Sequence, residues 1–123
     1  MDRLSALLAA VFLSTAAAAE TWSITEGICG DWAGSWNVTE NQDNIWLGAI
    51  NERHEGGKCE SANGELLTGN IRATIIGENF TAHQLGMSNG YDCTYTGSVS
   101  GNRIAGVYTC PQINRSFNFS ISR

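Results

Sequence analysis

Hydrophobic and polar residues alternate along most of the chain after its first twenty positions. Trp32, Gly34, Trp36 and Val38 share one face of the first predicted strand, and Phe117, Phe119 and Ile121 share one face of the last. A period of two residues indicates half-buried β-strands, and such runs recur at intervals of about ten residues, separated by Gly and Asn. No helical period occurs after residue 20. The pattern therefore predicts an all-β protein.

The middle of the chain adds three predicted segments. Residues 45–50, IWLGAI, are apolar on both faces and form either a central strand or a segment beneath a loop. Residues 51–65 are polar and are predicted as the longest irregular segment. Residues 67–75 alternate again, and a turn at Gly77-Glu78 would place Ile75 opposite Phe80.

The stretch CTYTGSVSGNRIAGVYTC, residues 93–110, reads almost the same from both ends. A two-residue turn at Gly101-Asn102 explains this symmetry, because Gly suits the first central position of a type II′ turn. The register then pairs Cys93 with Cys110, Tyr95 with Tyr108, Gly97 with Gly106, and Val99 with Ile104. Facing glycines inside strands favour a bend of the sheet over a ligand contact.

The same register assigns the disulfides. Cys93 and Cys110 fall on a non-hydrogen-bonded pair, whose Cα atoms lie about 4.5 Å apart, within the range that a disulfide accepts. Elimination leaves Cys29 and Cys59 for the second bridge, since the chain has four cysteines. A zinc site would need closely spaced cysteine pairs such as C-x-x-C, and the sequence contains none, so disulfides are favoured over zinc.

About seven or eight strands joined by short connections predict a single antiparallel up-and-down meander. Such a meander either closes into a small barrel or folds into a β-sandwich. The barrel is favoured because closure removes exposed strand edges. A barrel of this size holds side chains or one small ligand.

The first residues have the features of a secretory signal peptide. Residues 4–19 are apolar, follow Arg3 and end in four alanines. We expect a signal peptide at residues 1–19, a disulfide-stapled domain at residues 20–123, and no membrane span after cleavage. The expected location is periplasmic or secreted.

The net charge of −5 at pH 7 narrows the classes of partner that we expect for the protein. No cluster of lysine and arginine is present, which argues against nucleic acid and against an anionic membrane surface as partners. An acidic balance also keeps a small exported protein soluble.

Gly34-Ser35-Trp36 and the terminal Arg115 and Arg123 resemble the calycin pattern found in lipocalins and avidins. In that family a G-x-W motif lies on the first barrel strand and a cation from the last strand packs across the tryptophan. The resemblance implies an up-and-down barrel in which Trp36 and one of the two arginines are structural.

Residues 29–51 are similar to the start of avidin, with a Cys, the G-x-W motif, a polar turn and the run Leu-Gly-Ala-Ile-Asn. The biotin ligands of that family do not carry over, since Val38, Glu40 and Gln42 stand at the corresponding positions. No tryptophan follows Trp46 either. Biotin is therefore excluded as the expected ligand.

Few residues suggest catalysis or metal binding. His54 is predicted in a solvated loop, and one histidine beside carboxylates is not a metal-ligand set. His83 is expected to face Arg72 across two strands. Asp31 is a candidate acid without a visible partner. No motif marks a nucleophile, so we expect no enzyme activity, no metal and no cofactor.

Two binding functions remain, and each predicts its own residues. The first is an exported barrel that binds a small apolar or aromatic ligand at Tyr95, Tyr108, Trp36 and Trp46. The alternative is a protein-binding module that resembles periplasmic inhibitors of proteases or cell-wall hydrolases, with Trp22 and Ile24 as anchors on an N-terminal arm. A structural envelope protein is the third possibility.

Overall fold

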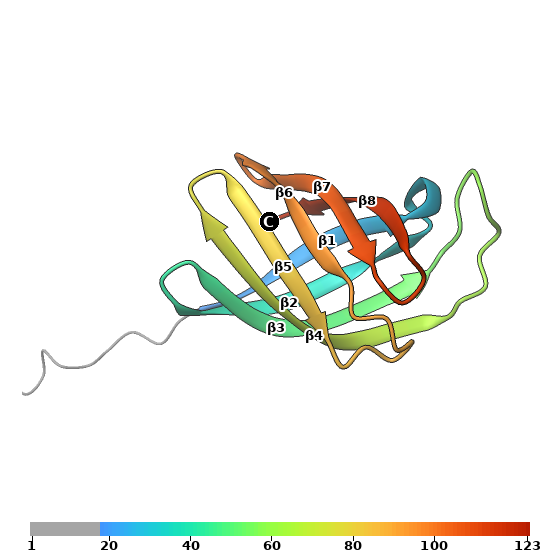
Figure 1. Ribbon diagram of the computed structural model, residues 1–123, viewed down its shortest axis with the longest axis horizontal. Coiled ribbons are helices and arrows are strands. Elements are labelled where there is room, and N and C mark those ends of the chain that lie inside the picture. The colour runs from blue at the N-terminus through green and yellow to red at the C-terminus, as the bar shows by residue number, and fades with distance from the viewer. Residues whose placement is uncertain (1–17) are drawn as a thin grey trace, which may run out of the picture.

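Inward apolar and outward polar side chains alternate through eight strands in the computed structural model, which describes residues 18–123 (Figure 1). The strands are β1 (Ala19–Gly27), β2 (Trp32–Gln42), β3 (Ile45–His54), β4 (Leu66–Ile76), β5 (Asn79–Leu85), β6 (Thr94–Ser100), β7 (Arg103–Cys110) and β8 (Arg115–Ser122), with a 3-10 turn η1 (Ile28–Gly30) after β1. The signal peptide predicted at residues 1–19 lies outside the described residues except for its last two positions, so it stays a prediction.

Each strand pairs with its neighbours in the sequence, and β1 also pairs with β8. All pairs are antiparallel. The predicted meander is confirmed, and it closes into a barrel instead of folding into a sandwich.

The mirrored hairpin has the predicted register. Tyr95 lies opposite Tyr108 and Val99 lies opposite Ile104. Gly101 has a φ of 60°, as the first central residue of a type II′ turn requires. Both predicted disulfides are present, and the Cα atoms of Cys93 and Cys110 lie 4.3 Å apart. The turn at Gly77-Glu78 likewise places Ile75 opposite Phe80.

The facing glycines Gly97 and Gly106 allow the backbones of β6 and β7 to approach closely. A Cβ atom at Gly106 would lie 2.1 Å from the carbonyl oxygen of Thr96 and 2.6 Å from the Cα atom of Gly97. Both contacts are to backbone, so no flexible side chain can move aside. These positions therefore serve the tight coiling of the sheet.

Replacing Gly106 by alanine is expected to lower the free energy of unfolding by ~1–3 kcal/mol, because the added methyl group forces the two strands apart. Urea denaturation of the variant and the wild type measures the change. Val107→Ala, on the exposed outer wall, is the control. An alanine variant as stable as the wild type would contradict the crowding described above.

Strand β1 was not predicted, and it corrects the expected N-terminal arm. Trp22 is 0% exposed and Ile24 is 2% exposed, and both lie inside the barrel. The prediction that these two residues anchor a partner protein on an exposed arm is therefore wrong. Their alternation with the exposed Thr21 and Thr25 is that of a wall strand, so the strand that begins at Trp32 is the second of the barrel, not the first.

Strand β3 is longer than the apolar run that predicted it. It continues from Ile50 through Glu52 to His54, and both of these polar side chains point inward and are buried. Because polar residues occupy inward positions here, the sequence predicted an irregular segment from residue 51, and the structure corrects this by extending the strand to His54.

Arg123 closes one end of the barrel. Its guanidinium carbon lies 5.2 Å from the ring centroid of Trp22 and 5.1 Å from that of Trp46, and it pairs with Glu20 at 3.5 Å. A cation from the end of the chain does cover indole rings, as the calycin resemblance implied. The rings are not that of Trp36, however, which lies on β2 in the interior.

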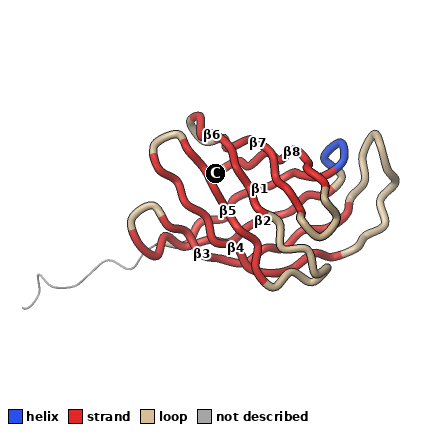
Figure 2. The backbone as a smooth tube through the Cα atoms, viewed as in Figure 1, coloured by secondary structure: helices blue, strands red, loops and turns tan. Residues whose placement is uncertain are grey.

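The two ends of the barrel differ in their connections (Figure 2). The turns between β2 and β3, β4 and β5, and β6 and β7 are short and lie at the end closed by Arg123. The opposite end carries η1 and the longer connections at residues 55–65, 86–93 and 111–114. Within residues 18–123, no helix has the length and apolar character needed to span a membrane.

Candidate functional site

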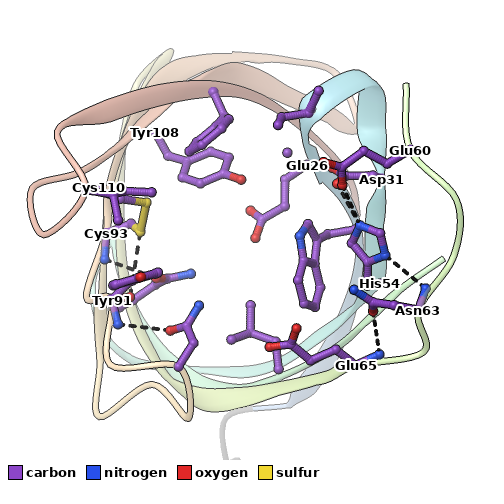
Figure 3. A pocket seen from close by; sticks show the side chains of 18 residues that line it. Glu26, Asp31, His54, Glu60, Asn63, Glu65, Tyr91, Cys93, Tyr108 and Cys110 are labelled. Atoms are coloured by element: carbon purple, nitrogen blue, oxygen red, sulfur yellow. Dashed lines mark hydrogen bonds and ion pairs between the residues drawn. A yellow bond between two sulfur atoms is a disulfide. The ribbon is translucent and has the colours of Figure 1, made fainter. Parts of the chain in front are cut away.

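A cavity of 590 Å³ opens at the barrel end that carries the longer connections (Figure 3). We call it the open-end cavity. Figure 3 shows the Cys93–Cys110 disulfide in one wall and the side chains of Asp31, His54 and Glu60 in the opposite wall. The closed sheet surrounds the site, and the two disulfides cross-link the chain beside it.

The lining of the cavity combines aromatic rings with carboxyl groups. The rings belong to Trp32, Tyr91, Tyr108 and Phe117, and the carboxyl groups belong to Glu26, Asp31, Glu60 and Glu65. Such a wall offers flat apolar surfaces for packing and acceptors for hydrogen bonds.

Asp31, His54 and Glu60 form one cluster in the wall. The Nε2 atom of His54 lies 2.8 Å from Oδ2 of Asp31 and 3.0 Å from Oε2 of Glu60. Asp31 follows η1, His54 ends β3, and Glu60 belongs to the connection at residues 55–65. The Cys29–Cys59 disulfide holds this arrangement, since Cys59 precedes Glu60 directly and Cys29 lies two residues before Asp31.

The backbone N–H of Asn63 determines which ring nitrogen of His54 carries the proton. It donates a hydrogen bond to Nδ1 at 3.3 Å, so the neutral ring is protonated at Nε2, between the two carboxylates. Burial lowers the pKa of His54, while hydrogen bonds to Asp31 and Glu60 raise it by more, to above the ordinary value. The backbone N–H of Asn63 opposes protonation of His54 at Nδ1, because the N–H groups of Asn63 and of the imidazolium would then point at each other.

The three ligand atoms lie within 4.8 Å of one another, close enough in principle for a metal ion. A histidine that binds metal through Nε2 carries its proton on Nδ1 and donates it to an acceptor. Nδ1 of His54 instead receives a hydrogen bond from Asn63. The geometry thus favours a hydrogen-bonded cluster over a metal site.

A second polar network crosses the barrel, and its residues Glu26, Gln84 and Cys93 line the cavity. The hydroxyl of Tyr95 donates to Oε1 of Glu26 at 2.6 Å and accepts from Nε2 of Gln84 at 2.8 Å. The Oε1 atom of Gln84 in turn accepts the backbone N–H of Cys93 at 3.0 Å. The network connects β1, β5 and β6 and ends at the disulfide in the wall.

Glu26 and Glu52 are two buried carboxyl groups that share this interior. They are 3% and 1% exposed, and Nε1 of Trp36 donates to Oε2 of Glu52 at 3.1 Å. Burial raises the pKa of Glu26 well above its ordinary value, and the charge of Glu52 raises it further. Burial also raises the pKa of Glu52, against the effect of its hydrogen bonds with Glu26 and Trp36. The two raised pKa values favour one proton shared by the pair over two ionised carboxylates.

Both tyrosines of the stacked pair remain hydrogen-bond donors at all physiological pH values. Burial raises the pKa of Tyr95 and of Tyr108, and the negative charge of Glu26 raises both further. The two rings stack with centroids 4.9 Å apart. In Figure 3 the hydroxyl of Tyr108 points toward the middle of the cavity.

Three of the four residues predicted to bind a ligand, Tyr108, Tyr95 and Trp36, contact one another in series, but they do not line one cavity together. Tyr108 lines the open-end cavity, and Tyr95 lies behind it, 1% exposed and bonded to Glu26. Trp36 is 0% exposed in the interior, and Trp46 lies under Arg123 at the other end. Only Tyr108 of the four is a lining residue.

Sequence reasoning missed most of the polar side chains of the site. His54 was predicted in a solvated loop and is 3% exposed inside the barrel, and the partner of Asp31 that the sequence did not show is His54 itself. The available signal was the phase of alternation. Glu26 continues the inward series of Trp22 and Ile24, and Glu52 and His54 continue that of Ile50.

Comparisons of the chain with protein-family models, with curated proteins and with solved structures found no significant match, so the site rests on this chain's own geometry.

Proposed function

We propose that the chain is a non-catalytic binding protein whose open-end cavity holds a small molecule with an apolar or aromatic body. The observation that carries the proposal is the cavity of 590 Å³ lined by four aromatic rings. Its volume lies in the range of ligand pockets, which are about 300–1,000 Å³. An eight-stranded barrel is also the size that holds one small ligand at its mouth.

The chemistry of the lining supports binding without catalysis. Among the described lining residues there is no serine or threonine, and both cysteines are in a disulfide. Among the described lining residues, His54 therefore has no serine or threonine hydroxyl and no free thiol beside it to activate. Two disulfides are typical of proteins in oxidising compartments, which supports a periplasmic or secreted location. A ligand-binding role of the calycin kind is the finer form of this proposal.

The test is binding of the neutral dye N-phenyl-1-naphthylamine, which gains fluorescence in apolar sites. We expect saturation at one dye per barrel. Trp32→Ala should weaken binding about tenfold, because it removes one ring of the wall, a loss of ~1.4 kcal/mol. Leu47→Ala, which removes an exposed apolar side chain from the outer wall, is the control.

Two results would contradict the proposal. The first is absence of a saturable signal from the wild type. The second is equal weakening by Trp32→Ala and Leu47→Ala, since it would place the dye on the outer surface instead of in the cavity.

A further inference from the structure

In the lining of the open-end cavity, carboxyl groups outnumber basic side chains. Four carboxyl groups line it, and of the lining residues in the described part of the chain none is lysine or arginine. His54 is the one basic side chain in the lining, and its Nε2 atom is shared between Asp31 and Glu60, so even a protonated His54 offsets only one of these two carboxylates. An anionic ligand that entered the cavity would lose its hydration and would be repelled by the carboxylates of the lining, so its binding is unfavourable.

One buried carboxyl oxygen in the wall lacks a partner. Asp31 is 2% exposed, and its Oδ1 atom accepts no hydrogen bond from any described residue. Its Oδ2 atom competes with Glu60 for the single proton on Nε2 of His54. A buried carboxylate with an unpaired oxygen is costly unless a donor or a cation reaches it.

Among residues 18–123, no lysine or arginine forms an ion pair with Asp31 or Glu60. The ion pairs among residues 18–123 are those of His54 in the cluster and that of Arg123 with Glu20 at the opposite end of the barrel. The negative charge beside the cavity is thus left for a ligand to neutralise. An ammonium group suits this role, since it brings one positive charge and three donors.

The aromatic side chains of the same wall complement such a ligand. The ring of Trp32 contacts the imidazole of His54 edge-on, with centroids 5.0 Å apart, and so stands beside the carboxylate cluster. A cation near an indole face gains ~0.5–2 kcal/mol, and the remaining rings provide surface for an apolar body.

We infer that the ligand of the open-end cavity is an organic amine with an aromatic or apolar body, and that Asp31 together with Glu60 receives its ammonium group. This inference rests on the proposed function, because it specifies the charge of the molecule that occupies the same cavity. Asp31 is a ligand-contacting residue in this assignment, and Trp32 packs against the ligand next to it.

Three ligands of nearly equal size test the charge. Phenethylamine is a cation at pH 7, 2-phenylethanol is neutral and phenylacetate is an anion. Calorimetric titration of the disulfide-bonded protein, in the presence of EDTA, should show the amine binding at least about tenfold more tightly than the alcohol, and the acid not binding. The amine should also displace N-phenyl-1-naphthylamine, which places it in the cavity.

Two variants with the same change of charge locate the effect. Asp31→Asn should lower the affinity for phenethylamine about tenfold and leave the affinity for 2-phenylethanol unchanged. Glu78→Gln removes an exposed carboxylate from the turn between β4 and β5, at the other end of the barrel, and should leave both affinities unchanged.

The outcomes separate this inference from the proposed function. Equal affinities for the amine and the alcohol, with dye binding intact, would overturn the inference and leave the proposed function standing. Failure of the dye and of all three ligands to bind would overturn both. Equal loss of amine affinity in Asp31→Asn and Glu78→Gln would show a general charge effect and remove Asp31 from the site.

Discussion

Replacing Trp36 by alanine is expected to lower the free energy of unfolding by about 3–5 kcal/mol, a large share of the ~5–15 kcal/mol that stabilises an ordinary small domain. Trp36 is 0% exposed, and its ring contacts the ring of Tyr95 edge-on with centroids 5.1 Å apart. The substitution leaves a cavity in the centre of the barrel that the closed sheet cannot collapse to fill.

The same substitution removes the donor to a buried carboxylate. Oε2 of Glu52 accepts Nε1–H of Trp36, and Oε1 of Glu52 has no partner among the described residues. Without Trp36 the carboxyl group of Glu52 loses its N–H donor, and the desolvation cost of ~1–3 kcal/mol for this lost bond places the total loss toward the upper end of the range above. Trp36→Phe helps to separate the two effects, since it removes the N–H but keeps a six-membered aromatic ring and so leaves a smaller cavity than alanine does.

Urea unfolding followed by circular dichroism measures these losses. The expected order of stability is wild type, then Trp36→Phe, then Trp36→Ala, with the control Val107→Ala within about 0.5 kcal/mol of the wild type. If Trp36→Phe were as stable as the control, the hydrogen bond to Glu52 would contribute nothing and the interior network would need reinterpretation.

The apolar pattern was enough to predict the class of fold and much of its register. The hairpin of β6 and β7 could be predicted residue by residue, because a symmetric sequence, a glycine turn and a cysteine pair all specify the same alignment. The β4–β5 turn followed from Gly77-Glu78 in the same way. In both hairpins several local sequence features predict the same register, and the packing of the barrel is compatible with that register.

The site could not be predicted because its side chains break the rule that inward positions are apolar. Three polar residues occupy inward positions of strands and are buried, namely Glu26, Glu52 and His54. Taken one at a time in the sequence, glutamate and histidine predict exposed positions. Their burial is tolerated only because partners from distant strands satisfy them, such as Tyr95 for Glu26, 69 residues away. These partners are far apart in the sequence and come together only in the closed barrel, so the sequence alone does not show which residues pair.

The shortfall of inward apolar residues is itself informative about the barrel. At the end closed by Arg123 the interior is filled by rings such as Trp22, Trp46 and Phe80, which pack against one another. Toward the open end the interior positions become carboxyl, amide and imidazole groups. This gradient along the barrel axis separates a packed base, which stabilises the fold, from a polar mouth that is available for binding.

Glu26→Gln is expected to make the protein less sensitive to rising pH and more stable than the wild type at pH 8. Burial raises the pKa of Glu26 well above its ordinary value, and the charge of Glu52 raises it further. The folded protein therefore keeps a proton that the unfolded chain releases above about pH 4.5. Since the folded state binds more protons, stability falls as pH rises from about 4.5 through the folded pKa.

Glutamine keeps the shape and the hydrogen bonds of the protonated acid. Its carbonyl oxygen accepts from Tyr95, and its amide group donates toward Glu52 as the carboxylic acid does. The variant has no proton to lose, so its advantage over the wild type should grow by about 1 kcal/mol or more between pH 5 and pH 8, with each unit of raised pKa contributing about 1.4 kcal/mol. The raised pKa values of Glu52 and His54 leave a smaller decline in the variant.

Urea midpoints measured at intervals between pH 4 and pH 8 give the two stability curves. Glu78→Gln, which removes an exposed carboxylate at the other end of the barrel, should follow the wild-type curve and excludes an effect of net charge. Parallel curves for the wild type and Glu26→Gln would mean that Glu26 is ionised in the folded protein. Any proton kept in the interior would then lie on Glu52 alone, and the shared proton between Glu26 and Glu52 would have to be abandoned.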